Sequence, residues 1–304
     1  MSNVEKKLKQ EGKSLPKRAP GPWPTGYNAE LDESPLLDDE AANLYQTYIG
    51  VFRWCNEIGR IDIITEISIL SSFSAAPREG HMDAVYHIFA YLKKKHNSRM
   101  IFDPSYPVID ESKFIDSDWS TFYAGAEEAI PADAPKPRGK EVMIRLFCDS
   151  SHADDKKTRR SRTGYFLFVN NAPVAWFSKK QSTIETSVFG AEFVAMKLGC
   201  EHNRALRYKL RMMGVPIYGP SYVYGDNMSV IHNTSKPEST LKKKSNSICY
   251  HFVRECAAMN EIRTCHIPTD ENPADLATKL IPSGMKRSKL VSMILYDIFD
   301  SGVW

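Results

Sequence analysis

The chain has 304 residues, and at roughly 150 residues per domain this length predicts about two domains. It carries 40 lysines and arginines against 37 aspartates and glutamates, so its net charge is +3, and 42% of its residues are hydrophobic. This composition is ordinary for globular proteins and excludes wholesale disorder, a collagen-like chain and a supercharged tail. The apolar runs are too short for a membrane span of about 20 residues, so we expect a soluble protein.

The amino terminus and the cysteines indicate an intracellular protein. The first residues, MSNVEKK, lack the apolar core of a secretory signal, and the six cysteines include no CxxC pair. We therefore interpret the cysteines as reduced thiols.

The first part of the chain combines a basic arm with a set of helices. Residues 1–27 hold six basic residues and four prolines, a mixture that neither packs nor sustains a helix, so we expect a disordered basic arm. After Asp38, apolar residues recur at helical spacing, and two further helices are predicted over 62–73 and 79–95. Residues 28–125 are therefore predicted to form a small helical region.

The second part of the chain begins after a predicted linker. Residues 126–140 are rich in alanine and proline and have few large apolar side chains, which is typical of a semi-rigid linker. Residues 141–304 then mix strand patterns with helical ones, including a long helix that ends at Gly214. The predicted strands cover 142–148, 164–169, 174–178, 221–225 and 262–267, and the other predicted helices follow Asn227, cover 247–259 and begin near Pro273. This order predicts an α/β sheet covered by helices.

Four acidic residues lie at or near the ends of predicted strands or within predicted helices. Asp149 follows the first strand, Glu192 lies inside the long helix, Asp226 follows the fourth strand, and Asp275 starts the last helix. Each alone could be an ordinary cap or surface charge. Burial of an unpaired charge after an apolar central strand, however, costs several kcal/mol unless a cation or partner compensates it. Carboxylate oxygens suit Mg²⁺ or Mn²⁺, and two such ions can support phosphoryl transfer, so the pattern favours nuclease chemistry.

Several segments of the sequence resemble the ribonuclease H region of copia-type retrotransposon polyproteins, and they occur in that family's order. These segments are residues 147–150 (FCDS), 162–165 (RTGY), 176–181 (WFSKKQ), 191–193 (AEF), 225–227 (GDN), 250–255 (YHFVRE) and 274–279 (ADLATK). Upstream, residues 45–50 (YQTYIG), 59–63 (GRIDI) and 90–94 (AYLKK) resemble the end of the same polyprotein's reverse transcriptase. The resemblance covers roughly residues 20 to 295.

The resemblance implies a ribonuclease H-like mixed five-stranded sheet for residues 141–304, and a thumb- or connection-like role for residues 28–125. It also implies that Asp149, Glu192, Asp226 and Asp275 are the catalytic metal ligands and hold two Mg²⁺ or Mn²⁺ ions, with Asp149 bridging both. The implied activity is cleavage of the RNA strand of RNA–DNA hybrids. The implied partners are the hybrid and the polymerase part of the same polyprotein, in the cytoplasm within virus-like particles or in the nucleus, without a membrane.

The sequence departs from the family in three places. It lacks the Tyr-x-Asp-Asp hairpin of polymerases, so we expect no DNA synthesis. His152 replaces the usual aromatic residue after the first aspartate and could face the site or the solvent, and His266 is not equated with the proton-shuttling histidine of other ribonucleases H. A non-catalytic nucleic-acid-binding module remains an alternative. An integrase-like enzyme is disfavoured because the helix acid comes second in chain order.

Basic residues near the predicted acidic site form a candidate nucleic-acid surface. They are Arg159, Arg160, Arg162, Lys179, Lys180, Lys242, Lys243 and Lys244. Each group could be a solvated face, but three groups beside one site favour contacts with phosphates. The small net charge implies a local stripe of basic residues.

Overall fold

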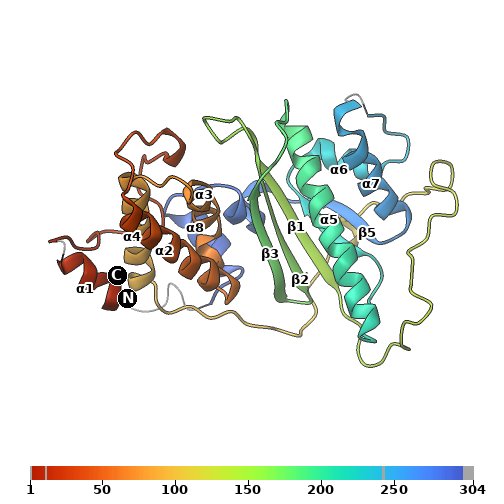
Figure 1. The fold of residues 1–304 in the computed structure, drawn as a ribbon. Helices are drawn as coiled ribbons and strands as arrows, with labels where there is room; N and C mark the ends of the chain where they lie inside the picture. Colours follow the sequence, from red (N-terminus) through yellow and green to blue (C-terminus); the bar gives the residue numbers. More distant parts are fainter. Residues whose placement is uncertain (1, 11, 242–243, 297–304) are drawn as a thin grey trace. The chain divides into compact units, whose positions relative to one another are not determined.

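The computed structural model describes residues 2–10, 12–241 and 244–296, which form two compact units (Figure 1). The helical unit comprises Met1–Met100, Asp155–Arg159 and Lys279–Trp304, and the sheet unit comprises Ile101–Asp154 and Arg160–Thr278. No helix among the described residues has both the length and the apolar character needed to cross a membrane.

The described residues of the helical unit form five α-helices and three short 3₁₀ turns. The helices are α1 (Ser2–Gln10), α2 (Asp39–Glu57), α3 (Ile64–Leu70), α4 (Glu79–Lys94) and α8 (Met285–Ser292), and the turns are η1 (Ala29–Leu31), η2 (Ile61–Ile63) and η3 (Ser71–Phe73). The predicted helix over 62–73 is thus a short α-helix between two 3₁₀ turns. Asp38 caps α2, because its side chain accepts a hydrogen bond of 2.8 Å from the backbone N–H of Ala41.

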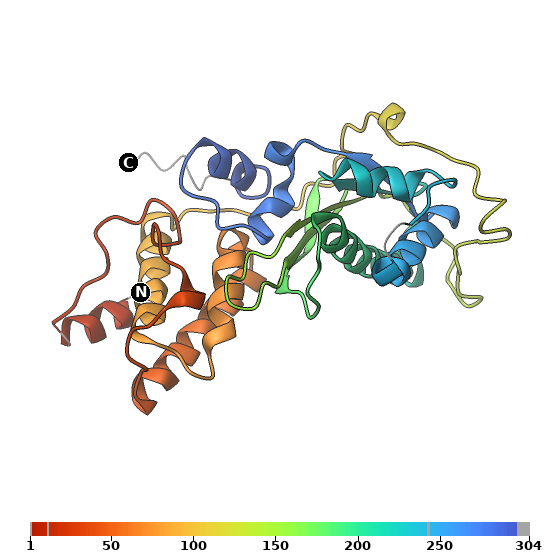
Figure 2. The same ribbon diagram turned by 90° about the horizontal axis from the view of Figure 1, so that it is seen from above.

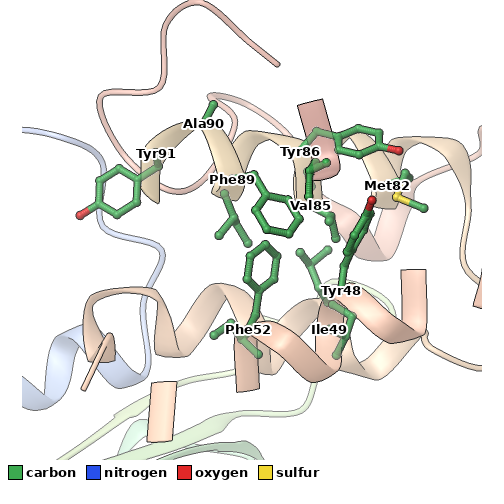
Figure 3. Packing of buried hydrophobic residues seen from close by; sticks show 14 of the residues in the cluster. Tyr48, Ile49, Phe52, Met82, Val85, Tyr86, Phe89, Ala90 and Tyr91 are labelled. Carbon is green, nitrogen blue, oxygen red and sulfur yellow. The ribbon is translucent and has the colours of Figure 1, made fainter. Parts of the chain in front are cut away.

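Aromatic and aliphatic side chains from α2 and α4 form the core of this unit (Figure 3). The rings of Phe52 and Phe89 lie 4.5 Å apart between their centroids, and Tyr48 meets Phe89 edge-on at 5.0 Å. Such pairs add stabilisation beyond the apolar area that they bury. The helical spacing predicted from the sequence therefore places one face of each helix in the core.

The prediction that residues 1–27 are disordered was wrong for the described part of that segment. Residues 2–10 form α1, and Val4 and Leu8, four residues apart on one helix face, are buried in the core of the helical unit. Ala19 is buried there too, and the carbonyl of Gly21 lies 3.0 Å from the ring nitrogen of His87. Few apolar residues are needed to hold an irregular segment when a core is already present.

The boundary predicted at residue 140 also differs from the observed units, because α8 belongs to the helical unit. Its Arg287 forms an ion pair with Glu66 at 3.4 Å and donates a hydrogen bond to the backbone carbonyl of Asp62. The Asp62 carboxylate pairs with Arg60 at 2.9 Å and accepts a hydrogen bond from the Tyr91 hydroxyl. All these charges are largely buried and paired, as buried charges must be.

A mixed five-stranded sheet forms the centre of the sheet unit and confirms the predicted fold class. Its strands are β1 (Ile144–Ser151), β2 (Arg162–Val169), β3 (Ala172–Lys180), β4 (Ser221–Gly225) and β5 (Ile262–His266), in the order β3-β2-β1-β4-β5. The first three strands pair antiparallel, whereas β1, β4 and β5 run parallel.

Helices α5 (Val188–Met212), α6 (Met228–Ser235) and α7 (Ser247–Ala258) share one core with a face of the sheet (Figure 2). At Gly199 of α5, an added Cβ would lie 2.6 Å from the sulfur of Cys148, so this glycine allows the helix to approach β1 closely. The predicted last helix differs: near Pro273 the chain forms a 3₁₀ turn, η7 (Pro273–Ala277), and α8 follows later. The other 3₁₀ turns of this unit are η4 (Glu111–Lys113), η5 (Lys244–Asn246) and η6 (Thr269–Glu271).

The predicted linker over 126–140 contains no helix or strand, but ion pairs connect it to α5. Glu128 accepts hydrogen bonds from Arg207 at 2.7 Å and from Arg211 at 2.6 Å. Burial alone would raise the pKa of the Glu128 carboxyl, but the hydrogen bonds and positive charges of the two arginines outweigh burial and lower this pKa to about 2.

Replacement of Glu128 by glutamine should therefore destabilise the protein in a pH-dependent manner. A carboxylate whose pKa is lower in the folded state stabilises that state above its ordinary pKa of 4.5, and this contribution is lost as the pH falls toward about 2. We expect E128Q to lower the free energy of unfolding by about 1.5–3 kcal/mol at pH 7, with a smaller difference at pH 3. Urea unfolding at both pH values measures this, and the exposed neighbour E127Q is the control. Equal loss at both pH values would contradict the ion pair.

The aromatic core predicts that two nearby residues of α2 contribute very differently to the free energy of unfolding. Phe52 is fully buried, whereas Trp54, two residues later, is 63% exposed. We expect Phe52→Ala to cost about 3–5 kcal/mol through the cavity it leaves, and Trp54→Ala to change stability by less than about 0.5 kcal/mol. Urea unfolding of both variants at pH 7 tests this, and equal effects would mean that the α2–α4 packing is wrong.

Candidate active site

The pairing of β1 with β4 brings two predicted acids to the same edge of the sheet. The two strands run parallel, and Phe147 pairs with Tyr224. Asp149 and Asp226 each come two residues later, so continuation of this register places them next to each other. Asp226 also directly precedes Asn227, whose side chain caps α6, so the helix begins two residues after Asp226.

The third acid comes from the beginning of α5. This helix starts after Ser187, whose hydroxyl accepts a hydrogen bond from the backbone N–H of Gly190. Glu192 lies one helical turn before Met196, and the side chain of Met196 approaches Gly225, the residue directly before Asp226. The helix therefore presents Glu192 toward the end of β4.

Together these elements form a cluster of three carboxylates. One oxygen atom from each of Asp149, Glu192 and Asp226 lies within 4.8 Å of the others. Asp149 is fully buried, Glu192 is 7% exposed, and Asp226 is half-buried. Burial raises the pKa of the adjacent Cys148 thiol well above its ordinary value, and the negative charges of Glu192 and Asp149 raise it further. The cluster thus concentrates negative charge where water is largely excluded.

The segment from the end of β5 to the residue after η7 supports these carboxylates, and sequence reasoning missed its role. Thr269 donates a hydrogen bond of 2.8 Å from its hydroxyl to Asp226, and the hydroxyl of Thr278 donates one to Asp149. The Asn272 side chain donates to the carbonyl of Cys148 at 2.9 Å and caps the turn that follows. An asparagine followed by proline at the first helical position is a recognisable capping signal, so Asn272 could have been found.

Asp275 is not among the three residues whose carboxylate oxygens lie within 4.8 Å of one another, and its place in the predicted set of four stays a prediction. It is fully buried in η7, a tight 3₁₀ turn that packs against β1 and β2. This packing requires Gly164 on β2, because an added Cβ would lie 2.6 Å from the Thr278 methyl and 2.7 Å from the Ala277 methyl. The tight turn, rather than the predicted helix start, determines where Asp275 lies.

Neither histidine near the cluster is among its members. His152 is exposed, and its ring Nε2 lies 3.1 Å from the backbone carbonyl of Glu185. His266 is half-buried at the end of β5, where it pairs with Gly225 in the sheet register.

The predicted basic residues differ in how exposed their side chains are. Arg159, Lys179 and Lys244 are exposed, and Arg160 and Lys180 are half-buried. The prediction was wrong for Arg162, which is the first residue of β2 and only 4% exposed, so it cannot contribute to an exposed basic surface. Lys242 and Lys243 lie outside the described residues.

The chemistry of the carboxylate cluster fits a divalent cation. Three oxygen donors within a few ångströms, two of them on buried side chains, provide hard ligands of the kind that Mg²⁺ and Mn²⁺ prefer. Like charges at this spacing repel one another in a medium of low polarity, and a bound cation would relieve that repulsion.

Comparison with known proteins identifies relatives among transposon polyproteins. Over 253 residues the chain is 24% identical to the retrovirus-related Pol polyprotein from transposon TNT 1-94 of Nicotiana tabacum, a match that covers 82% of this chain and 16% of that polyprotein. Over 220 residues it is 23% identical to the Pol polyprotein from transposon RE1 of Arabidopsis thaliana, covering 72% and 13% of the two chains. The chain therefore spans about one sixth or less of these relatives.

Among solved structures, the LC11 ribonuclease H1 in complex with an RNA/DNA hybrid aligns with a TM-score of 0.36 at 15% identity, over 44% of this chain and 93% of that chain. No protein-family model matches the chain. The homologues are retrovirus-related Pol polyproteins, as the sequence resemblance predicted, and the strand order and mixed pairing of the sheet are those of a ribonuclease H-like fold.

The carboxylate cluster predicts opposite effects of one substitution with and without metal. In EDTA, Asp226→Asn should raise the free energy of unfolding by about 1 kcal/mol, because it removes one of three repelling charges while keeping an acceptor for Thr269. With Mn²⁺, the same variant should lose most of the stabilisation that bound metal gives the unmodified chain. Thermal unfolding with both additives measures this, and the exposed Asp133→Asn is the control. A variant that is less stable in EDTA, or that keeps the full Mn²⁺ effect, would argue against the site.

Proposed function

We propose that this chain is the ribonuclease H part of a copia-type Pol polyprotein and cleaves the RNA strand of RNA–DNA hybrids with two Mg²⁺ or Mn²⁺ ions. The observation that carries the proposal is the cluster of Asp149, Glu192 and Asp226 at the edge of a ribonuclease H-like sheet. The similarity to retrovirus-related Pol polyproteins supports it, because the sequence segments that carry the predicted acids resemble the ribonuclease H region of such polyproteins.

In this proposal the three clustered carboxylates would hold the metal, and Asp275 would complete the set from the adjoining turn. Divalent ions at such a site supply an activated water and stabilise the oxygens of the transferred phosphoryl group. The chain's own residues orient the ligands: Thr278 holds Asp149 and Thr269 holds Asp226 through their hydroxyl groups. Fixed ligands of this kind need little reorganisation when charge develops during the reaction.

The proposed substrate follows from general features of hybrid duplexes. A protein can distinguish RNA by its 2′-hydroxyls and the wide, shallow minor groove, so we expect little dependence on base sequence. Exposed basic residues such as Lys179 and Lys244 would contact phosphates without reading bases. The polymerase part of a polyprotein is the proposed partner, inside the cell.

A cleavage assay on the full chain tests this proposal. We expect it to cut the RNA strand of a labelled hybrid with Mg²⁺ or Mn²⁺, and Asp149→Asn to reduce the rate at least 1,000-fold, since it removes a metal ligand. Asp133→Asn, an exposed acid, is the control and should cut at the normal rate. The melting temperature of each variant verifies that it folds.

Two results would contradict the proposal. Cleavage in excess EDTA, or equal rates for the chain and Asp149→Asn, would exclude the carboxylate cluster as the active site. Binding of the hybrid without cleavage by the unmodified chain would favour the non-catalytic nucleic-acid-binding module.

A further inference from the structure

The helical unit contains a cavity that is separate from the carboxylate cluster. Its volume is about 600 Å³, which is within the usual range for sites that take small molecules. The lining residues come from the segment before α2, from the end of α4 and from the beginning of α8: Arg18, Ala19, Pro20, Tyr91, Lys94, Lys95, Ser283, Gly284, Arg287 and Ser288. All of them belong to the helical unit, so the cavity lies within one compact body.

Among the described residues, the charged side chains that line this cavity are all positive. They are Arg18, Lys94, Lys95 and Arg287, and the described lining includes no aspartate or glutamate. Arg18 and Lys94 are exposed and belong to no ion pair within the described part of the chain. A concave, uniformly cationic surface focuses the electrostatic field and attracts anions.

The neighbouring acids do not cancel this charge. Asp62 and Glu66 are matched by Arg60 and Arg287 in the buried ion-pair network, so those four residues balance. The excess charge of the cavity therefore comes from Arg18 and Lys94. In addition, Nε of the buried Arg287 has no hydrogen-bond partner among the described residues, although its two terminal nitrogens are engaged.

The backbone at the beginning of α8 adds hydrogen-bond donors to the same cavity. Gly284 precedes the helix and has no side chain, so the N-cap residue of α8 provides no side-chain acceptor for the first turn. The hydroxyls of Ser283 and Ser288 lie in the lining as well. Backbone N–H groups at a helix start favour negative charge, and phosphate oxygens are a common occupant.

The remaining wall of the cavity is apolar. Ala19 and Tyr91 are both buried there, and Pro20 and the aliphatic stems of the lysines extend the same surface. A ligand that suits this cavity therefore combines an anionic group with a flat, largely apolar body. A nucleoside that carries a phosphate has both features.

We propose that this cavity binds a nucleoside phosphomonoester, with the phosphate held by Arg18, Lys94 and the start of α8 and the nucleoside against the wall formed by Ala19, Pro20 and Tyr91. The ligand would be either a free nucleotide or the 5′-phosphorylated end of a nucleic-acid strand, which present the same group. The cavity belongs to the helical unit, whereas the carboxylate cluster belongs to the sheet unit. The proposed binding therefore involves none of the metal-binding carboxylates and does not depend on nuclease activity.

Calorimetric titration of the full chain with adenosine monophosphate in EDTA tests the proposal. We expect adenosine monophosphate to bind at least 10-fold more tightly than adenosine, because only the nucleotide carries the phosphate. The double variant Arg18→Gln/Lys94→Gln should bind it at least 10-fold more weakly. Lys6→Gln/Lys17→Gln removes the same charge from two exposed lysines of the same region that do not line the cavity, and should bind within 2-fold of the unmodified chain.

A second titration distinguishes the two sources of the phosphate. A thymidine hexanucleotide with a 5′-phosphate is compared with the same strand ending in a 5′-hydroxyl, and a preference that Arg18→Gln/Lys94→Gln abolishes would identify a strand end as the ligand. Binding of adenosine monophosphate alone would identify a free nucleotide. Equal affinities of the double variant and the unmodified chain, or no phosphate-dependent binding of either probe at millimolar concentration, would overturn the proposal. Because no metal is present, failure here leaves the cleavage assay unaffected.

Discussion

Repulsion among three buried or half-buried carboxylates is the constraint on which the proposed active site depends. Asp149, Glu192 and Asp226 come from a strand, a helix and a strand end, and they approach one another at the cost of electrostatic repulsion. The sheet register and the hydroxyls of Thr269 and Thr278 keep them together. An arrangement that is unfavourable without a counter-charge is what a site for divalent cations requires.

Burial of charge also organises the helical unit, but there the charges are matched. Arg287 of α8 reaches the buried acids near α3, and this contact joins a segment from the end of the chain to helices from its beginning. The sheet unit is therefore inserted between two parts of the helical unit in sequence. Removal of residues 1–125 would also remove the partners of Arg287. This would leave a buried unpaired charge, which is strongly destabilising.

Local patterns predicted much of this structure correctly. The apolar spacing of α2 and α4, the apolar runs of the central strands and the stop of α5 before Gly214 are all visible in the sequence, because they follow from the helical period of 3.6 residues, from burial of both faces of a central strand and from glycine at a helix end. The failures have a common cause. The packing of residues 2–10, the burial of Arg162 and the tight turn at Asp275 all depend on neighbours that are distant in the chain.

The sequence by itself determined the family resemblance, the order of the strands, and the acids in β1 and directly after β4, since residue type and spacing carry that information. Only the tertiary structure decided which acids meet, because the positions of Glu192 and Asp275 depend on how α5 and η7 pack against the sheet. It also decided that Arg18 shares a cavity with Lys94 and Arg287. Arg18 and Lys94 come from segments far apart in the chain and leave no local pattern, so their shared electrostatic field arises only when the helices pack.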